Sequence, residues 1–139
     1  MCGITKKEAA TDIVLPGVYN PNVTQDNINQ TICVKGWTAT IRPPESYTEA
    51  LKKKQMDALG LPGKPEEYEE DHFIPLELGG HPTDPNNLWP QLWDITNPCS
   101  AHIKDKDEND FREAVCASKQ TLAAARTAIA DKWEHCKRP

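Results

Sequence analysis

The sequence has little of what marks a membrane protein, a zinc ribbon or a polycation. It contains no run of about 18 apolar residues, and its first residues, MCGITKKEAATD, lack the apolar core of a signal peptide. We therefore expect a soluble chain without a membrane span. None of its five cysteines belongs to a CxxC pair, which argues against a zinc ribbon. The 16 Lys and Arg are outnumbered by 21 Asp and Glu, so a polyanionic partner would have to meet a local basic patch.

The length of 139 residues fits one domain with its own core. Residues 1 to 30 are rich in Pro, Asn, Thr and Gln and show no period, so they predict an extended arm ahead of a domain over residues 31 to 139. Five cysteines fit two disulfides and one unpaired thiol in a secreted or periplasmic protein, whereas reduced cysteines in a cytoplasmic protein are the alternative. Cys2 is the simplest unpaired residue, and its place after Met1 would suit a lipid anchor.

The order of predicted elements indicates an α+β fold. A hairpin is expected over residues 31 to 44, where β-branched and aromatic residues are broken by Gly36 and stopped by two prolines. The other expected elements are a helix over 45 to 59, a strand over 68 to 78 and a short strand over 88 to 93. Two helices follow, the first capped by Ser100 and the second by Thr121 or Ser118. In the last helix, Leu122, Ile129 and Trp133 form one apolar stripe.

The stretch EEDHFIPLELGG places a carboxylate and an imidazole side by side, ahead of two glycines. Neighbouring side chains of a strand point to opposite faces, so Asp71 and His72 cannot both enter one core. An imidazole can take a proton from water near neutral pH, and a carboxylate oxygen suits Mg²⁺ or Mn²⁺. This pair is therefore the first candidate for chemistry.

Three stretches taken together, DHFIPLELGG, NNLWPQ and AHIKDKDEND, resemble the HNH endonuclease family. The resemblance implies a ββα-metal (HNH) core within residues 68 to 117, with an N-terminal hairpin or arm and flanking helices around it. It also implies a divalent-metal-dependent endonuclease that hydrolyses phosphodiester bonds in DNA, with RNA as the alternative substrate and Mg²⁺ or Mn²⁺ as the cofactor. The remaining length holds no separate recognition domain, so we expect low sequence specificity and a monomer.

The resemblance also implies roles for single residues. His72 would be the catalytic base, Asp71 a metal ligand, and the amide of Asn87 would bridge the loop and orient the histidine. The family's usual spacing for the helix ligand falls on Thr96, so that ligand must come later. The candidates on the helix are Asp105, Glu108, Asn109 and His102, of which Glu108 is the first choice and His102 the second; an acidic solvated helix face is the alternative.

Further expectations concern substrate, disulfides and isolated residues. Basic residues that could contact phosphate are Arg42, Lys52 to Lys54, Lys104, Lys106 and Arg112. A bridge from Cys33 to Cys116 would tie the hairpin to the metal-bearing helix, and Cys99 with Cys136 would then tie the helical end. Trp89 and Trp93 are expected in the core, and His81 and His135 at the surface. A non-catalytic binding module with the same fold is the rival of the nuclease, and a structural zinc protein a weaker one.

Overall fold

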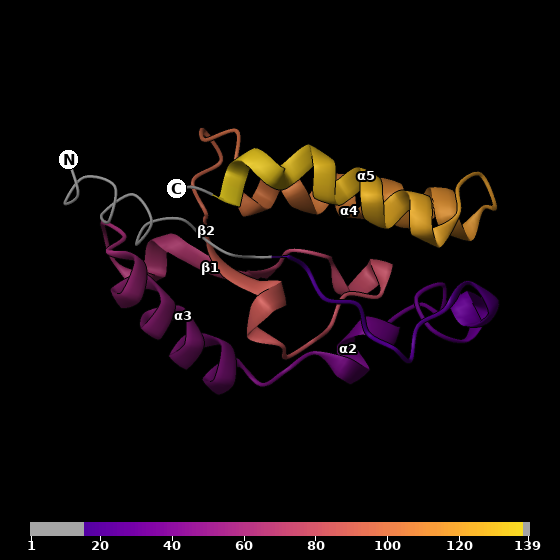
Figure 1. Cartoon of the computed structure of the whole chain (residues 1–139), viewed down its shortest axis with the longest axis horizontal. Helices are drawn as coiled ribbons and strands as arrows, with labels where there is room; N and C mark the ends of the chain where they lie inside the picture. Colours follow the sequence, from indigo (N-terminus) through magenta and orange to yellow (C-terminus); the bar gives the residue numbers. More distant parts are fainter. Residues whose placement is uncertain (1–15, 138–139) are drawn as a thin grey trace.

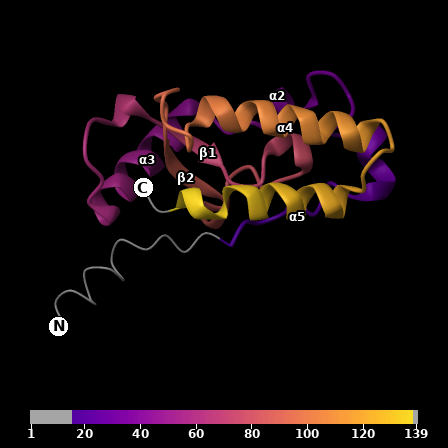
Figure 2. The same cartoon turned by 90° about the horizontal axis from the view of Figure 1, so that it is seen from above.

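The computed structural model describes residues 16–137 of the chain, and its fold is α+β (Figure 1). The helices are α2 (Trp37–Ile41), α3 (Glu45–Leu59), α4 (Ala101–Cys116) and α5 (Leu122–Trp133), and the strands are β1 (Tyr68–His72) and β2 (Leu88–Leu92). Helices α4 and α5 lie side by side on one side of the two-stranded sheet, and α3 lies on the other side (Figures 1 and 2). Among these described helices, none combines the length and the apolar character that crossing a bilayer requires.

Strands β1 and β2 pair antiparallel, with Asp71 opposite Trp89 and His72 opposite Leu88. The first strand is shorter than predicted, because the chain bends after His72 and forms a 3-10 turn over Leu76–Leu78. The backbone of Ile74 pairs with the side-chain amide of Asn87 rather than with a neighbouring strand. Gly80 then packs so closely against the Ile74 carbonyl that a Cβ would overlap it. The second strand agrees with the prediction.

The predicted hairpin over residues 31 to 44 is wrong, since this stretch forms turns and helix α2. Gly36 adopts a left-handed conformation, with φ of 80°, at the start of α2. The carbonyl of Ile32, which a ladder would need, accepts a hydrogen bond of 2.7 Å from Arg112 Nε. Ile32 itself is buried in the helical core. Long-range packing against α4 and α5 therefore overrides the local strand preference.

Residues 16 to 30 contribute more than an extended arm. Val23 and Ile28 are buried in the same core as Leu122, Ile129 and Trp133 of α5. The expectation of little core from this segment is therefore corrected for its described part. The expectations on residues 1 to 15, including the lipid anchor at Cys2, lie outside the described residues.

The helical end of the domain agrees well with the sequence predictions. The Ser100 hydroxyl accepts a hydrogen bond from Ile103 N, and the Thr121 hydroxyl accepts one from Ala124 N, so both N-caps are confirmed. Disulfides join Cys33 to Cys116 and Cys99 to Cys136, which confirms the expected connectivity. Of the two tryptophans expected in the core, Trp89 is buried, whereas Trp93 is 42% exposed.

Candidate active site

A cavity of about 550 Å³ opens where β1 and α4 face the segment from α2 to α3. Both Asp71 and His72 line it, although they stand on opposite faces of β1. Its wall holds seven carboxylates, namely Glu45, Glu69, Glu70, Asp71, Glu77, Asp105 and Glu108. Arg42 is the single Lys or Arg among the described residues that line it. The cavity as built would attract a cation and repel a phosphate.

Three of these carboxylates form a group that could hold a metal ion. Glu69 and Asp71 alternate along β1 and so share one face, and Asp105 approaches them from α4. One oxygen of each lies within 4.8 Å of the others. Burial, followed by the charge of Asp71, raises the pKa of Glu69 to about 8, and the same two causes raise the pKa of Asp105. Three hard oxygen donors of this kind fit Mg²⁺ or Mn²⁺.

Lys104 lies behind this group and is completely buried. Its ammonium donates to Asp71 Oδ2 at 2.9 Å, to Glu108 Oε2 at 2.7 Å and to the His72 carbonyl at 2.8 Å. Burial by itself lowers the pKa of Lys104, but the charges of Asp71 and Glu108 raise it above its ordinary value. The lysine is therefore a fixed internal cation that ties α4 to the end of β1. It cannot reach a substrate phosphate, which corrects the expected role of Lys104.

His72 is held in one tautomer by the backbone. Its Nε2 lies 2.9 Å from the carbonyl of Pro82. Because a carbonyl can only accept, Nε2 carries the hydrogen and the neutral ring keeps a lone pair on Nδ1. Burial lowers the pKa of His72 below 6.5, although the Pro82 hydrogen bond and Asp71 act in the other direction. The side chain is therefore a neutral proton acceptor at pH 7.

The amide of Asn87 is fully buried and bridges the loop as the resemblance implies. Its Oδ1 accepts from Ile74 N at 3.0 Å and Val18 N at 3.3 Å, and its Nδ2 donates to the carbonyls of Ile74 and His81. These bonds fix both ends of the loop that joins His72 to Pro82. Asn87 does not line the cavity, so any effect on chemistry acts through the position of His72.

The four helix residues considered as metal ligands differ in whether they line the cavity. Asp105, Glu108 and Asn109 all line the cavity, and of these Asp105 belongs to the metal-ligand group while Glu108 is committed to Lys104. His102, one turn earlier, is exposed, and its ring packs on Trp93 with ring centroids 3.7 Å apart. It does not line the cavity. The geometry therefore favours Asp105 over Glu108, the first choice from the sequence, as the metal ligand on α4.

Two of the basic residues proposed for phosphate contact, Lys104 and Arg112, are engaged elsewhere. Arg112 donates to the Ile32 carbonyl, and Lys104 is buried. Arg42 is exposed and lines the cavity, so it keeps the expected position. Lys53 and Lys54 of α3 are exposed as well, whereas Lys52 is 4% exposed.

Sequence reasoning missed two residues of the site, Glu69 and Glu70. Glu69 could have been found, since it stands two residues before Asp71 and must share its face in a strand. Glu70 is buried, and within the described part of the chain neither of its oxygens has a hydrogen-bond partner. Burial raises the pKa of Glu70 to about 8, against the charge of Lys52.

Comparison with known proteins adds nothing to this geometry, because no family model, no curated protein and no solved structure matches the chain.

Proposed function

We propose that the protein is a divalent-metal-dependent endonuclease of the HNH type that hydrolyses phosphodiester bonds in DNA. The observation that carries the proposal is the meeting, in one cavity, of a neutral His72 held by Pro82 with the carboxylates of Glu69, Asp71 and Asp105. The chain order also supports it, since strand, loop, strand and helix follow one another as in the family that the motif resembles.

The carboxylate group would hold the cation, with Lys104 keeping Asp71 in place from behind. A bound divalent cation would reverse the negative field of the cavity and stabilise the charge that builds on the phosphate during hydrolysis. Arg42 at the cavity would contact a neighbouring phosphate.

The base in this proposal is Nδ1 of His72. It takes a proton from a water molecule, whose oxygen attacks phosphorus while the bond to the leaving oxygen breaks, and solvent then protonates that oxygen. The Nε2–H bond to Pro82 holds the ring during the transfer and stabilises the positive charge that it acquires. The two disulfides support an exported location for this activity.

One observation favours the rival function, a non-catalytic binding module. The ammonium of Lys104 already forms ion pairs with Asp71 and Glu108 of the cavity without any added ion. An acidic cavity that keeps its structure without a metal ion could bind a basic segment of a partner protein.

Plasmid cleavage with Mg²⁺, Mn²⁺ or a chelator tests the proposal. We expect metal-dependent nicking or cutting, a loss of about 10²-fold or more in His72→Ala, and an acid limb below pH 6.5 because protonated His72 cannot accept a proton. His102→Ala is the matched control, since this exposed histidine lies outside the cavity and should leave the rate unchanged. Undiminished cleavage by His72→Ala would refute the base, and a folded wild-type chain that fails to cleave the plasmid with either Mg²⁺ or Mn²⁺ would favour the binding module.

A further inference from the structure

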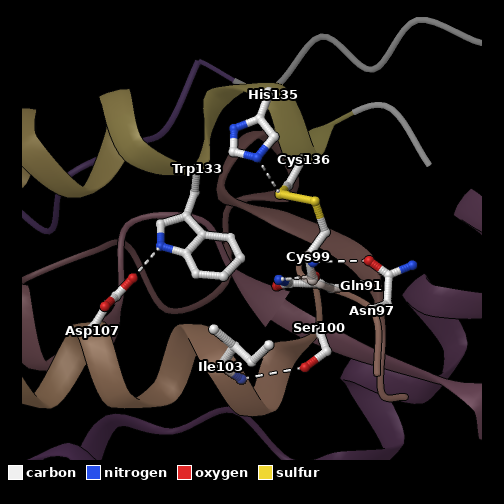
Figure 3. The surroundings of a disulfide bond; sticks show 9 residues. All are labelled: Gln91, Asn97, Cys99, Ser100, Ile103, Asp107, Trp133, His135 and Cys136. Atoms are coloured by element: carbon white, nitrogen blue, oxygen red, sulfur yellow. Dashed lines mark hydrogen bonds between the residues drawn. A yellow bond between two sulfur atoms is a disulfide. The ribbon is translucent and has the colours of Figure 1, made fainter. Parts of the chain in front are cut away.

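A second set of metal-ligating atoms lies outside the cavity, where the end of α5 meets the start of α4 (Figure 3). The sulfur atoms of Cys99 and Cys136 and one ring nitrogen of His135 all lie within 4.8 Å of one another. His135 Nε2 is 3.4 Å from Cys136 Sγ. In this structure the two sulfurs are joined as a disulfide, so neither is a thiolate that could bind a metal.

We propose that Cys99, Cys136 and His135 form a zinc site that depends on the redox state of the two cysteines. The site cannot bind zinc while the disulfide is intact, and it can bind zinc once a dithiol has reduced the disulfide. The proposal is independent of the nuclease activity, because none of these residues lines the carboxylate cavity.

The spacing of the ligand atoms is close to what zinc needs. Bonds of about 2.3 Å to sulfur and about 2.0 Å to nitrogen, in a tetrahedron, place sulfur and nitrogen about 3.5 Å apart and two sulfurs about 3.8 Å apart. The distance between His135 Nε2 and Cys136 Sγ already has this value. Reduction then has to separate the two sulfurs from 2.04 Å, which rotation of the cysteine side chains can do.

The backbone around the site is held by bonds other than the disulfide, as Figure 3 shows. Cys99 N donates to Asn97 Oδ1 at 2.8 Å, and Gln91 Nε2 donates to the Cys99 carbonyl at 2.7 Å. On the other side, Trp133 is buried and its Nε1 donates to Asp107 of α4 at 2.9 Å. The two halves of the site should therefore stay together after reduction.

The donor set selects a soft or borderline ion. Two thiolates and an imidazole favour Zn²⁺ and disfavour Mg²⁺, which is the reverse of the carboxylate group. Three protein ligands leave a fourth position for water. His135 is exposed and Cys99 is half-buried, so both the reductant and the metal can reach the site from solvent.

The chemistry balances in two steps. The dithiol gives two electrons and two protons to the Cys99–Cys136 disulfide, which becomes two thiols while the reductant becomes a disulfide. The Zn²⁺ ion then binds two thiolates and neutral His135 Nε2, and the two thiol protons are released to solvent.

Cobalt substitution in the full chain tests this site. The protein is reduced with a dithiol, separated from it without oxygen, and titrated with Co²⁺, whose sulfur ligands give a charge-transfer band in the near ultraviolet. We expect one equivalent of Co²⁺ to give this band in the reduced protein only, and Zn²⁺ to abolish it. His135→Ala should weaken binding about tenfold or more, because one of three ligands is lost.

The other disulfide provides the matched control. Cys33→Ser/Cys116→Ser should keep the cobalt band, and Cys99→Ser/Cys136→Ser should lose it. If Cys33→Ser/Cys116→Ser does not fold, the change of the cobalt band in His135→Ala, which keeps all the cysteines, tests the site instead. Three results would overturn the proposal. They are the absence of a cobalt band in the reduced chain, a band that remains in Cys99→Ser/Cys136→Ser, and Co²⁺ binding that does not change in His135→Ala.

Discussion

The two faces of strand β1 both carry buried acidic groups, but a lysine neutralises only one of them. On the face toward α4, Asp71 accepts a hydrogen bond from Lys104, which is completely buried and also binds Glu108. The carboxylates on this side therefore have a fixed positive charge beside them. This face also holds Asp105, the third member of the candidate metal group.

On the face toward α3, the corresponding lysine is Lys52, but its hydrogen bonds go elsewhere. Lys52 donates to Glu49 at 3.0 Å and to the Tyr68 carbonyl at 2.9 Å. Within the described chain Glu70 is left without a hydrogen-bond partner, and its pKa rises to about 8. The comparison shows that a nearby lysine gives a buried carboxylate a charged hydrogen bond only where its ammonium can reach it, as it reaches Asp71 and does not reach Glu70.

Replacing Lys104 and Lys52 one at a time should give the largest difference between the two faces. Lys104→Met leaves Asp71 and Glu108 buried together without a cation, so we expect a loss of about 3–5 kcal/mol in the free energy of unfolding. Lys52→Met should cost only about 1–2 kcal/mol, because Glu49 is 43% exposed and water can replace the pair. Urea denaturation of both variants at pH 7, with the disulfides intact, measures the difference.

Added Mg²⁺ gives the control for this pair of variants. If the cavity binds a cation, Mg²⁺ should restore part of the stability of Lys104→Met and none of that of Lys52→Met. Equal losses in the two variants, with no response to Mg²⁺, would show that the two faces are energetically alike.

The sequence predicted those parts of the fold that local chemistry decides. The N-caps at Ser100 and Thr121 depend on residues three positions apart, and the short second strand depends on its own residues. The hairpin prediction is wrong, and one backbone group that a hairpin would use, the Ile32 carbonyl, instead binds Arg112, which lies 80 residues further along the chain. No local pattern shows such a contact.

The candidate site divides in the same way. Asp71, His72 and Asn87 were found because the motif places them at fixed positions along the chain. The ranking on α4 stays a prediction, since Asp105 and Glu108 both line the cavity and the contact that commits Glu108 to Lys104 depends on how α4 packs against β1. The burial of Lys104 could have been suspected from its i,i+4 spacing to Glu108, but its contact with Asp71 crosses 33 residues.

The second prediction sharpens the comparison on the α4 face. Asp105→Asn removes one charged ligand from the group with Glu69 and Asp71, so we expect Mn²⁺ affinity to fall by about tenfold or more. Asp110→Asn is the matched control, because Asp110 is exposed on the same helix and pairs with Lys106. Calorimetric titration of Mn²⁺ measures both. An unchanged affinity in Asp105→Asn would remove Asp105 from the group.

The effect expected on the α3 face, at Glu70, depends on pH and is small at low pH. Its folded pKa of about 8 lies above the ordinary value of 4.5, so the unfolded chain loses this proton first as pH rises. The side chain therefore costs no ionisation energy below about pH 4.5 and destabilises the fold progressively between pH 4.5 and 8. Glu70→Gln cannot ionise, and the shift in pKa should make it more stable than wild type by up to about 4 kcal/mol at pH 8 and by less than about 1 kcal/mol at pH 5. Chemical denaturation at the two pH values, without divalent cations, measures this difference.

Glu66→Gln, at an exposed position, should show no such dependence on pH. A stability difference that is the same at pH 5 and pH 8 would mean that Glu70 does not hold its proton through this range, and that its lack of a partner on the α3 face has no electrostatic consequence.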